Sequence, residues 1–116
     1  MLKPHPVSAK PPYPSEHGWY YFEGSPKTFI EGSATVAPTV KIQDSAKILG
    51  YATLQDDCVI YGNATVMGQA VVGEGAKVGG DAIVQDGVQL YGTTHVCGKA
   101  NLGGNNIQLY DNVFNK

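Results

Sequence analysis

The chain has little charge of either sign. Aspartate, glutamate, lysine and arginine make up 16% of its 116 residues, and the formal net charge is −2; an average soluble domain has about 25% charged residues. This balance excludes both a basic nucleic-acid-binding surface and the high net charge of a disordered chain. No apolar run approaches the roughly 18 residues that a membrane span needs. We therefore expect neither nucleic acid nor a membrane among the partners.

Cysteine and histidine are also scarce, with two and three copies. Two cysteines do not make a disulfide framework. The stretch from Met1 to Pro6 has neither the apolar core nor the small-residue cleavage site of a signal peptide. The expected location is therefore a reducing compartment such as the cytoplasm.

Proline is almost confined to the first 29 residues, which hold six of the seven copies. Proline-rich stretches favour extended conformations and resist helix formation. The aromatic run Trp19-Tyr20-Tyr21-Phe22 lies in the same segment. We interpret residues 1–29 as a Pro/aromatic arm and N-terminal cap.

From Ile30 onward, three columns of residues repeat with a period of six. An aliphatic residue recurs every six positions, a turn former follows it by two positions, and a small or slim residue follows it by four. Only Glu74 is unusual among the turn formers. The aliphatic column is Ile30, Val36, Ile42, Ile48, Leu54, Ile60, Val66, Val72, Val78, Val84, Leu90, Val96 and Leu102.

A period of six fits a short strand followed by a bend, with three such units in each triangular coil. The aliphatic residue points inward and its two neighbours point outward, because side chains alternate along a strand. The coils stack about 4.8 Å apart through parallel backbone pairing. We predict a single all-β domain, a parallel β-helix of about four and a third coils over residues 30–104. The aliphatic register slips after Leu102, so residues 105–116 are expected to form a C-terminal cap.

One stretch of the repeats is Val59-Ile60-Tyr61-Gly62-Asn63-Ala64-Thr65-Val66. This pattern and the three columns resemble the hexapeptide-repeat family in its V-x-G-[ND]-A-x variant. The resemblance covers residues 28 to about 105. It implies a left-handed β-helix and, commonly, a homotrimer of parallel prisms. The variant is often seen in structural or phage-borne members.

The resemblance also implies what an enzyme of this family needs. Its acyltransferases and γ-class carbonic anhydrases depend on histidines, and the predicted coils contain only His95. His95 and Cys97 form a weak metal candidate, because two ligands fall short of the three or four that zinc takes. No inserted loop interrupts the repeats to hold a catalytic base or a coenzyme. We expect no catalytic residue, no bound metal and no cofactor.

One predicted outer face carries a contiguous apolar stripe, made of Phe29, Leu49, Met67 and Ile83. Such stripes usually mark interfaces, and each buried side chain contributes about 1.5–3 kcal/mol. We predict that the stripe forms the homotrimer interface. The aromatic run Trp19, Tyr20, Tyr21 and Phe22 has two readings, as a cap on the open first coil or as a docking segment for another protein.

The expected function is a non-catalytic trimeric module for structure, assembly or binding. The repeat style favours a phage tail fibre, spike or accessory protein, which would make the location virion-associated or cytoplasmic. One alternative is a small inhibitor or sequestering protein that binds a host protein or a small ligand. Another is a trimeric acyltransferase-like or γ-carbonic-anhydrase-like enzyme with sites between chains.

Overall fold

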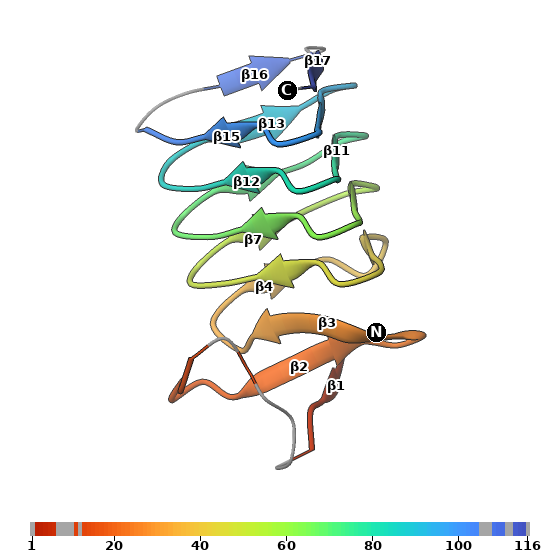
Figure 1. Ribbon diagram of the computed structural model, residues 1–116, viewed down its shortest axis with the longest axis vertical. Helices are drawn as coiled ribbons and strands as arrows, with labels where there is room; N and C mark the ends of the chain where they lie inside the picture. The colour runs from red at the N-terminus through yellow and green to blue at the C-terminus, as the bar shows by residue number, and fades with distance from the viewer. Residues whose placement is uncertain (1, 7–10, 12, 105–107, 111–112, 116) are drawn as a thin grey trace.

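The computed structural model describes residues 2–6, 11, 13–104, 108–110 and 113–115, and throughout these residues the secondary structure is strand and turn. Within this part of the chain, no helix is long and apolar enough to cross a membrane. The strands stack as a β-solenoid of about four turns (Figure 1). The predicted all-β fold of stacked parallel strands is confirmed.

Three sheets form the sides of the solenoid. The first face contains, in spatial order, β1 (Leu2–Pro4), β2 (Trp19–Phe22), β3 (Ser25–Glu31), β6 (Lys47–Ile48), β9 (Thr65–Val66), β12 (Ile83–Val84) and β15 (Asn101–Leu102). The second face contains β4 (Thr35–Val36), β7 (Thr53–Leu54), β10 (Val71–Val72), β13 (Gln89–Tyr91) and β16 (Gln108–Tyr110). The third face contains β5 (Lys41–Ile42), β8 (Val59–Ile60), β11 (Lys77–Val78), β14 (His95–Cys97) and β17 (Val113–Asn115).

Equivalent repeat positions lie directly above one another. On the first face Ile30 pairs with Ile48, Ile48 with Val66, and Val66 with Val84, all in parallel register. On this face each aliphatic residue therefore meets the one 18 positions later. A slip of one residue would turn every aliphatic side chain outward, which is why the period specifies the register so strongly.

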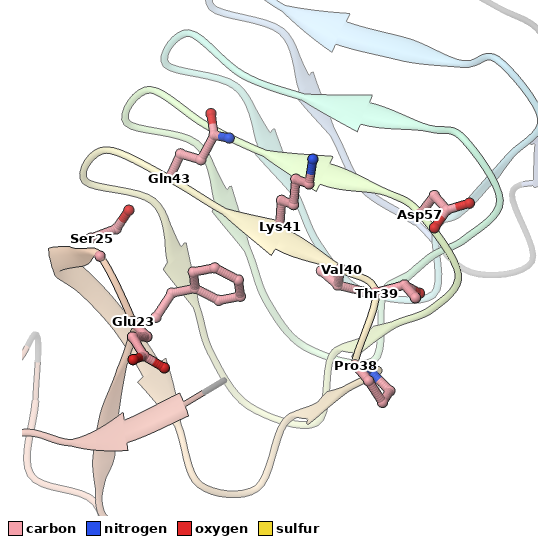
Figure 2. Close-up of a pocket in the computed structure, with 10 residues that line it drawn as sticks. Glu23, Ser25, Pro38, Thr39, Val40, Lys41, Gln43 and Asp57 are labelled. Carbon is pink, nitrogen blue, oxygen red and sulfur yellow. The ribbon is translucent and has the colours of Figure 1, made fainter.

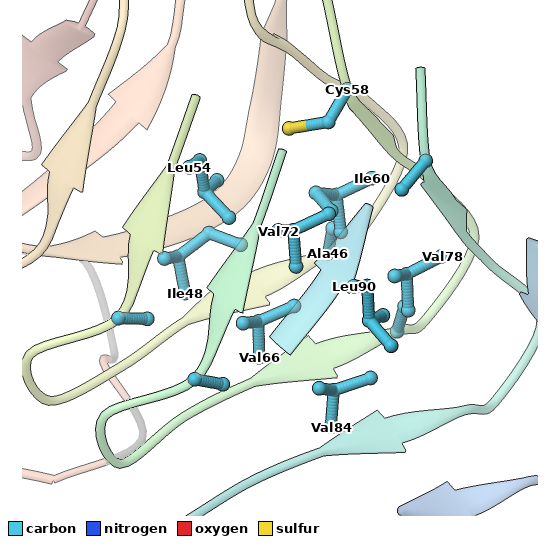
Figure 3. Packing of buried hydrophobic residues seen from close by; sticks show 14 of the residues in the cluster. Ala46, Ile48, Leu54, Cys58, Ile60, Val66, Val72, Val78, Val84 and Leu90 are labelled. Carbon is cyan, nitrogen blue, oxygen red and sulfur yellow. The ribbon is translucent and has the colours of Figure 1, made fainter. Parts of the chain in front are cut away.

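The interior is filled by the aliphatic and small columns (Figure 3). Eleven aliphatic positions from Ile30 to Val96 are fully buried, whereas Val36 and Leu102, near the two ends, are partly buried. The small column lies in the same core, and Cys58 occupies one of its slots with no exposure. Its burial raises the pKa of the Cys58 thiol to about 12.

The corners explain the turn-forming column. Its glycines from Gly50 to Gly98 have φ between 64° and 67°, and Asp44, Asp56, Glu74 and Asp86 have φ between 53° and 61°. This left-handed conformation costs a residue with a β-carbon roughly 1–2 kcal/mol. Each of these four acidic residues also accepts a hydrogen bond from a backbone N–H one coil further on. The acceptor–donor pairs are Asp44 with Gly62 (2.9 Å), Asp56 with Glu74 (3.0 Å), Glu74 with Gly92 (2.5 Å) and Asp86 with Gly104 (3.2 Å).

The two ends of the solenoid are built differently. At the N-terminal end, β1 and β2 extend the first face in antiparallel fashion, while β4 and β5 are the terminal strands of the other two faces. At the C-terminal end, β16 and β17 pair in parallel with β13 and β14. The segment expected to be a C-terminal cap lies partly outside the described residues, and its described strands add a further layer to two of the sheets.

Candidate functional site

The aromatic run of β2 is divided between two sides of its strand. Tyr20 and Phe22 pack against the hydrophobic core, as the inward members of an alternating strand do. On the opposite side, the Trp19 ring meets the Phe29 ring edge-on at a centroid distance of 6.0 Å. Tyr21 lies 5.0 Å from the ring of His5, which stacks on Phe29 at 4.2 Å. The four aromatic residues thus belong to two separate clusters.

Glu31 ties the segment before β2 to the first face. Its side chain is only 7% exposed, and it accepts hydrogen bonds from the Tyr13 hydroxyl, from Ser15 Oγ at 2.6 Å and from the Gly50 N–H at 2.9 Å. Burial by itself would raise the pKa of Glu31. The bonds from Ser15, Tyr13 and Gly50, with His17 nearby, outweigh burial and lower it.

Tyr13 also contacts Trp19. Its carbonyl accepts a hydrogen bond from Trp19 Nε1 at 2.9 Å, and the two rings meet edge-on at 5.1 Å. Burial, followed by the Glu31 carboxylate, raises the pKa of Tyr13 to about 12. Sequence reasoning missed Glu31 as a functional residue. The available signal was a carboxylate at an outward position within an otherwise apolar stripe.

The apolar stripe is partly covered by the chain itself. Phe29 is contacted by His5 and Trp19, and Leu49 is only 7% exposed. Met67 and Ile83, further along the same face, are partly exposed. The surface that the stripe can offer to another chain is therefore centred on Met67 and Ile83, and its use in a trimer remains a prediction.

His95 and Cys97 lie on the outer side of β14, and the structure adds Tyr61 to them. The Tyr61 hydroxyl and His95 Nε2 are hydrogen-bonded at 2.6 Å. This reach is possible because the Tyr61 ring lies over Gly79, where an added β-carbon would be 2.0 Å from ring atom Cζ. Burial, and then the neighbouring Cys97, raise the pKa of Tyr61.

This cluster offers few ligands to a metal. The Tyr61 bond already engages Nε2 of His95, and Cys97 is a half-buried free thiol. Among the described residues, no three His, Cys, Asp or Glu side chains come together in a way that could hold a metal ion. The arrangement can position the imidazole and form polar contacts, and we assign it no reaction.

Two adjoining hollows lie at the N-terminal end, between the β2–β3 hairpin and the first coil. The larger, about 620 Å³, has a mixed lining, in which polar side chains such as Glu23, Lys41 and Asp57 lie beside Phe22, Pro38 and Val40 (Figure 2). The smaller, about 300 Å³, is apolar and is lined by Leu2, Phe22, Val36, Ala37 and Pro38. Sequence reasoning missed both, because they form between segments whose relative placement the repeat does not specify.

No family model, curated protein or solved structure matches the chain. The β-solenoid therefore rests on the chain's own repeats and strand pairing.

Proposed function

We propose that this chain is a rigid, non-catalytic module for structure, assembly or binding, formed by a homotrimer of left-handed hexapeptide-repeat prisms. The observation that supports it is the unbroken coil-to-coil register. From β3 to β15, equivalent positions pair in parallel without an inserted loop that could fold over a substrate. The hand and the family follow from the resemblance of the repeats.

The use of the polar side chains supports the same proposal. The acidic corner residues hold the N–H groups of the next coil, Glu31 holds the N-terminal segment, and His95 is bonded to Tyr61. A general acid or base needs a positioned group with room for a substrate proton nearby. Each of these groups already has a hydrogen-bond partner within the protein, which supports a structural use of them.

The homotrimer is supported by the exposed end of the apolar stripe. Burying a side chain such as Met67 or Ile83 in an interface contributes about 1.5–3 kcal/mol each. The same proposal places the protein in a phage tail fibre or spike. This part is supported only by the resemblance of the repeat sequences to phage-borne members.

Native mass spectrometry of the purified protein tests the assembly. We expect a mass of three chains for the native protein and a mass of one chain for the double variant Met67→Lys/Ile83→Lys. The matched control is Val71→Lys, an outward position on the second face, which should remain trimeric. A monomeric native protein, or a trimer that is indifferent to the double variant, would overturn the assigned interface.

Calorimetric titration with acetyl coenzyme A, together with a carbon dioxide hydration assay in the presence of zinc, tests the non-catalytic role. We expect neither binding of acetyl coenzyme A nor hydration above the uncatalysed rate. Saturable binding of acetyl coenzyme A would favour the acyltransferase alternative, and zinc-dependent hydration would favour the carbonic-anhydrase alternative.

A further inference from the structure

The second face of the solenoid has no charge at its outward positions. Its strands β4, β7, β10, β13 and β16 present only neutral residues to the outside, namely Thr35, Ala37, Thr53, Gln55, Val71, Gly73, Gln89, Tyr91, Gln108 and Tyr110. The first face carries Glu31 and Lys47 at equivalent positions, and the third carries Lys41 and Lys77. A neutral face in a protein with acidic and basic residues elsewhere favours a neutral partner.

Two tyrosines form a stacked platform on this face. The Tyr91 and Tyr110 rings are nearly parallel, with 24° between their planes and 5.4 Å between their centroids. Tyr91 lies against the backbone at Gly73, where an added β-carbon would meet ring atoms Cδ1 and Cε1 at 3.2 Å. Tyr110 is 54% exposed. Glycine at position 73 therefore leaves room for the Tyr91 ring against the backbone, and the Tyr110 ring stacks on that ring.

A row of amides runs beside the platform. Gln108 Nε2 donates a hydrogen bond to Gln89 Oε1 at 3.0 Å, on the same two strands that carry the tyrosines. Each of these amides keeps its other polar atom for a further partner. Gln55 lies in the tyrosine column on the other side of Gly73, with Oε1 3.4 Å from the β-carbon position. Neutral donors and acceptors thus flank the aromatic rings.

We infer that this face is a binding surface for a neutral glycan chain, seated on Tyr91 and Tyr110. A pyranose ring has an apolar C–H face bordered by hydroxyl groups, so it fits an exposed aromatic ring beside uncharged donors and acceptors. Tyr91 and Tyr110 lie on adjacent coils about 4.8 Å apart, so they meet successive parts of an extended polymer. The inference concerns a different face from the proposed trimer interface and goes beyond the proposed function.

Charge argues against the other linear polymers that stack on aromatic rings. Single-stranded nucleic acid needs a positively charged groove along its backbone in addition to aromatic platforms. The outward positions of the second face carry no lysine or arginine, and the corner that follows this face carries the exposed acidic residues Asp56, Asp57 and Glu74. These carboxylates repel polyanions, whereas a neutral polysaccharide meets no such penalty.

Native affinity electrophoresis tests the inference directly. The full chain is run in gels that contain a soluble β-glucan, galactomannan, arabinoxylan or dextran, with polygalacturonate and heparin as polyanionic comparisons. We expect one or more of the neutral polysaccharides to retard the protein and the two polyanions to leave it unretarded. Retardation should also survive added salt, because no ion pair is involved.

Variants at Tyr110 and Gln108 test whether the stacked tyrosines and the neighbouring amides bind the polysaccharide. Tyr110→Ala should weaken binding roughly tenfold, Tyr110→Trp should retain it, and Gln108→Ala should weaken it less than Tyr110→Ala. The matched control is Tyr51→Ala, which removes a tyrosine of similar exposure, 64%, from a corner outside the platform. Because Tyr110 is exposed, the circular dichroism spectrum of its variants should match that of the native protein.

The inference is overturned if none of the four neutral polysaccharides retards the native protein, or if Tyr110→Ala and Tyr51→Ala behave alike. If Tyr110→Ala changes the native mass and glycans have no effect, the face belongs to a second copy of the chain. A glycan-binding monomer would refute the proposed trimer and leave the binding surface intact.

Discussion

Gly80 offers a sharp test of how the corners hold the coils together. It lies between β11 and β12 with φ at 64°. An added β-carbon would be 2.7 Å from the nitrogen and 2.8 Å from the oxygen of Gly98, one coil further on. These are backbone atoms, so the substitution must displace the coil itself.

Gly80→Ala should therefore destabilise the protein by about 2–3 kcal/mol. The left-handed conformation accounts for roughly 1–2 kcal/mol of this cost, and the displaced backbone adds about 1 kcal/mol. Gly80→Asn introduces the same β-carbon but should cost less. Asparagine tolerates this conformation, and its Oδ1 can accept the Gly98 N–H as Asp44 accepts that of Gly62 in the same row of corners. The recovered hydrogen bond is worth about 0.5–1.5 kcal/mol.

Urea unfolding followed by far-ultraviolet circular dichroism, at one protein concentration for all variants, gives the three free energies of unfolding. The expected order of stability is native, then Gly80→Asn, then Gly80→Ala. A neutral Gly80→Ala would refute the close approach of the two corners. If Asn were no better than Ala, the coil-to-coil hydrogen bond would have no role in the corner's stability.

Three further predictions concern the core, the N-terminal segment and the thiols. Ile60→Ala should cost about 2–5 kcal/mol because it leaves a cavity in a fully buried layer; thermal unfolding should separate it from Val59→Ala, at the adjacent outward position, and equal losses would contradict the inward column. The pKa of Glu31 is lower in the folded state than its ordinary 4.5, so its stabilising contribution should be complete above about pH 4.5 and lost as the pH falls through the folded value. Fluorescence of the single tryptophan between pH 6 and 3 should report the release of this segment, with the transition absent in Glu31→Gln; an unchanged transition in that variant would exclude Glu31 as its cause. In a native thiol titration Cys97 should react with a disulfide reagent, whereas Cys58, fully buried with a pKa raised to about 12, should react only after unfolding; prompt reaction of both thiols would contradict the burial of Cys58.

At the C-terminal end, the strict six-residue period predicted an earlier end of the coils than the structure has. After Leu102 the aliphatic register fails at Gln108, and we expected the coils to stop there. In the structure Leu109 pairs with Leu90, nineteen residues earlier, whereas Leu90 pairs with Val72 eighteen residues earlier. One extra residue between β15 and β16 therefore restores the inward position, and a period-six pattern cannot accommodate that insertion.

The sequence by itself determined the solenoid. Three columns of aliphatic, small and turn-forming residues require stacked coils that bury every sixth side chain, and the glycines of the turn column from Gly50 to Gly98 adopt the left-handed corner conformation without strain. Even Glu74, the unusual member of the turn column, adopts the conformation of its neighbours. Such a pattern is readable because each repeat imposes the same requirement on its neighbours.

Only the tertiary structure decided which outward side chains contact one another. The pairing of Glu31 with Tyr13 and Ser15, of Tyr61 with His95, and of Tyr91 with Tyr110 joins residues 16 to 34 positions apart. Outward side chains are free of the packing that constrains the core, so the repeat does not specify which of them meet. Those contacts depend on how the N-terminal hairpin folds back and on where a glycine leaves room for an aromatic ring, and both are properties of the assembled coils.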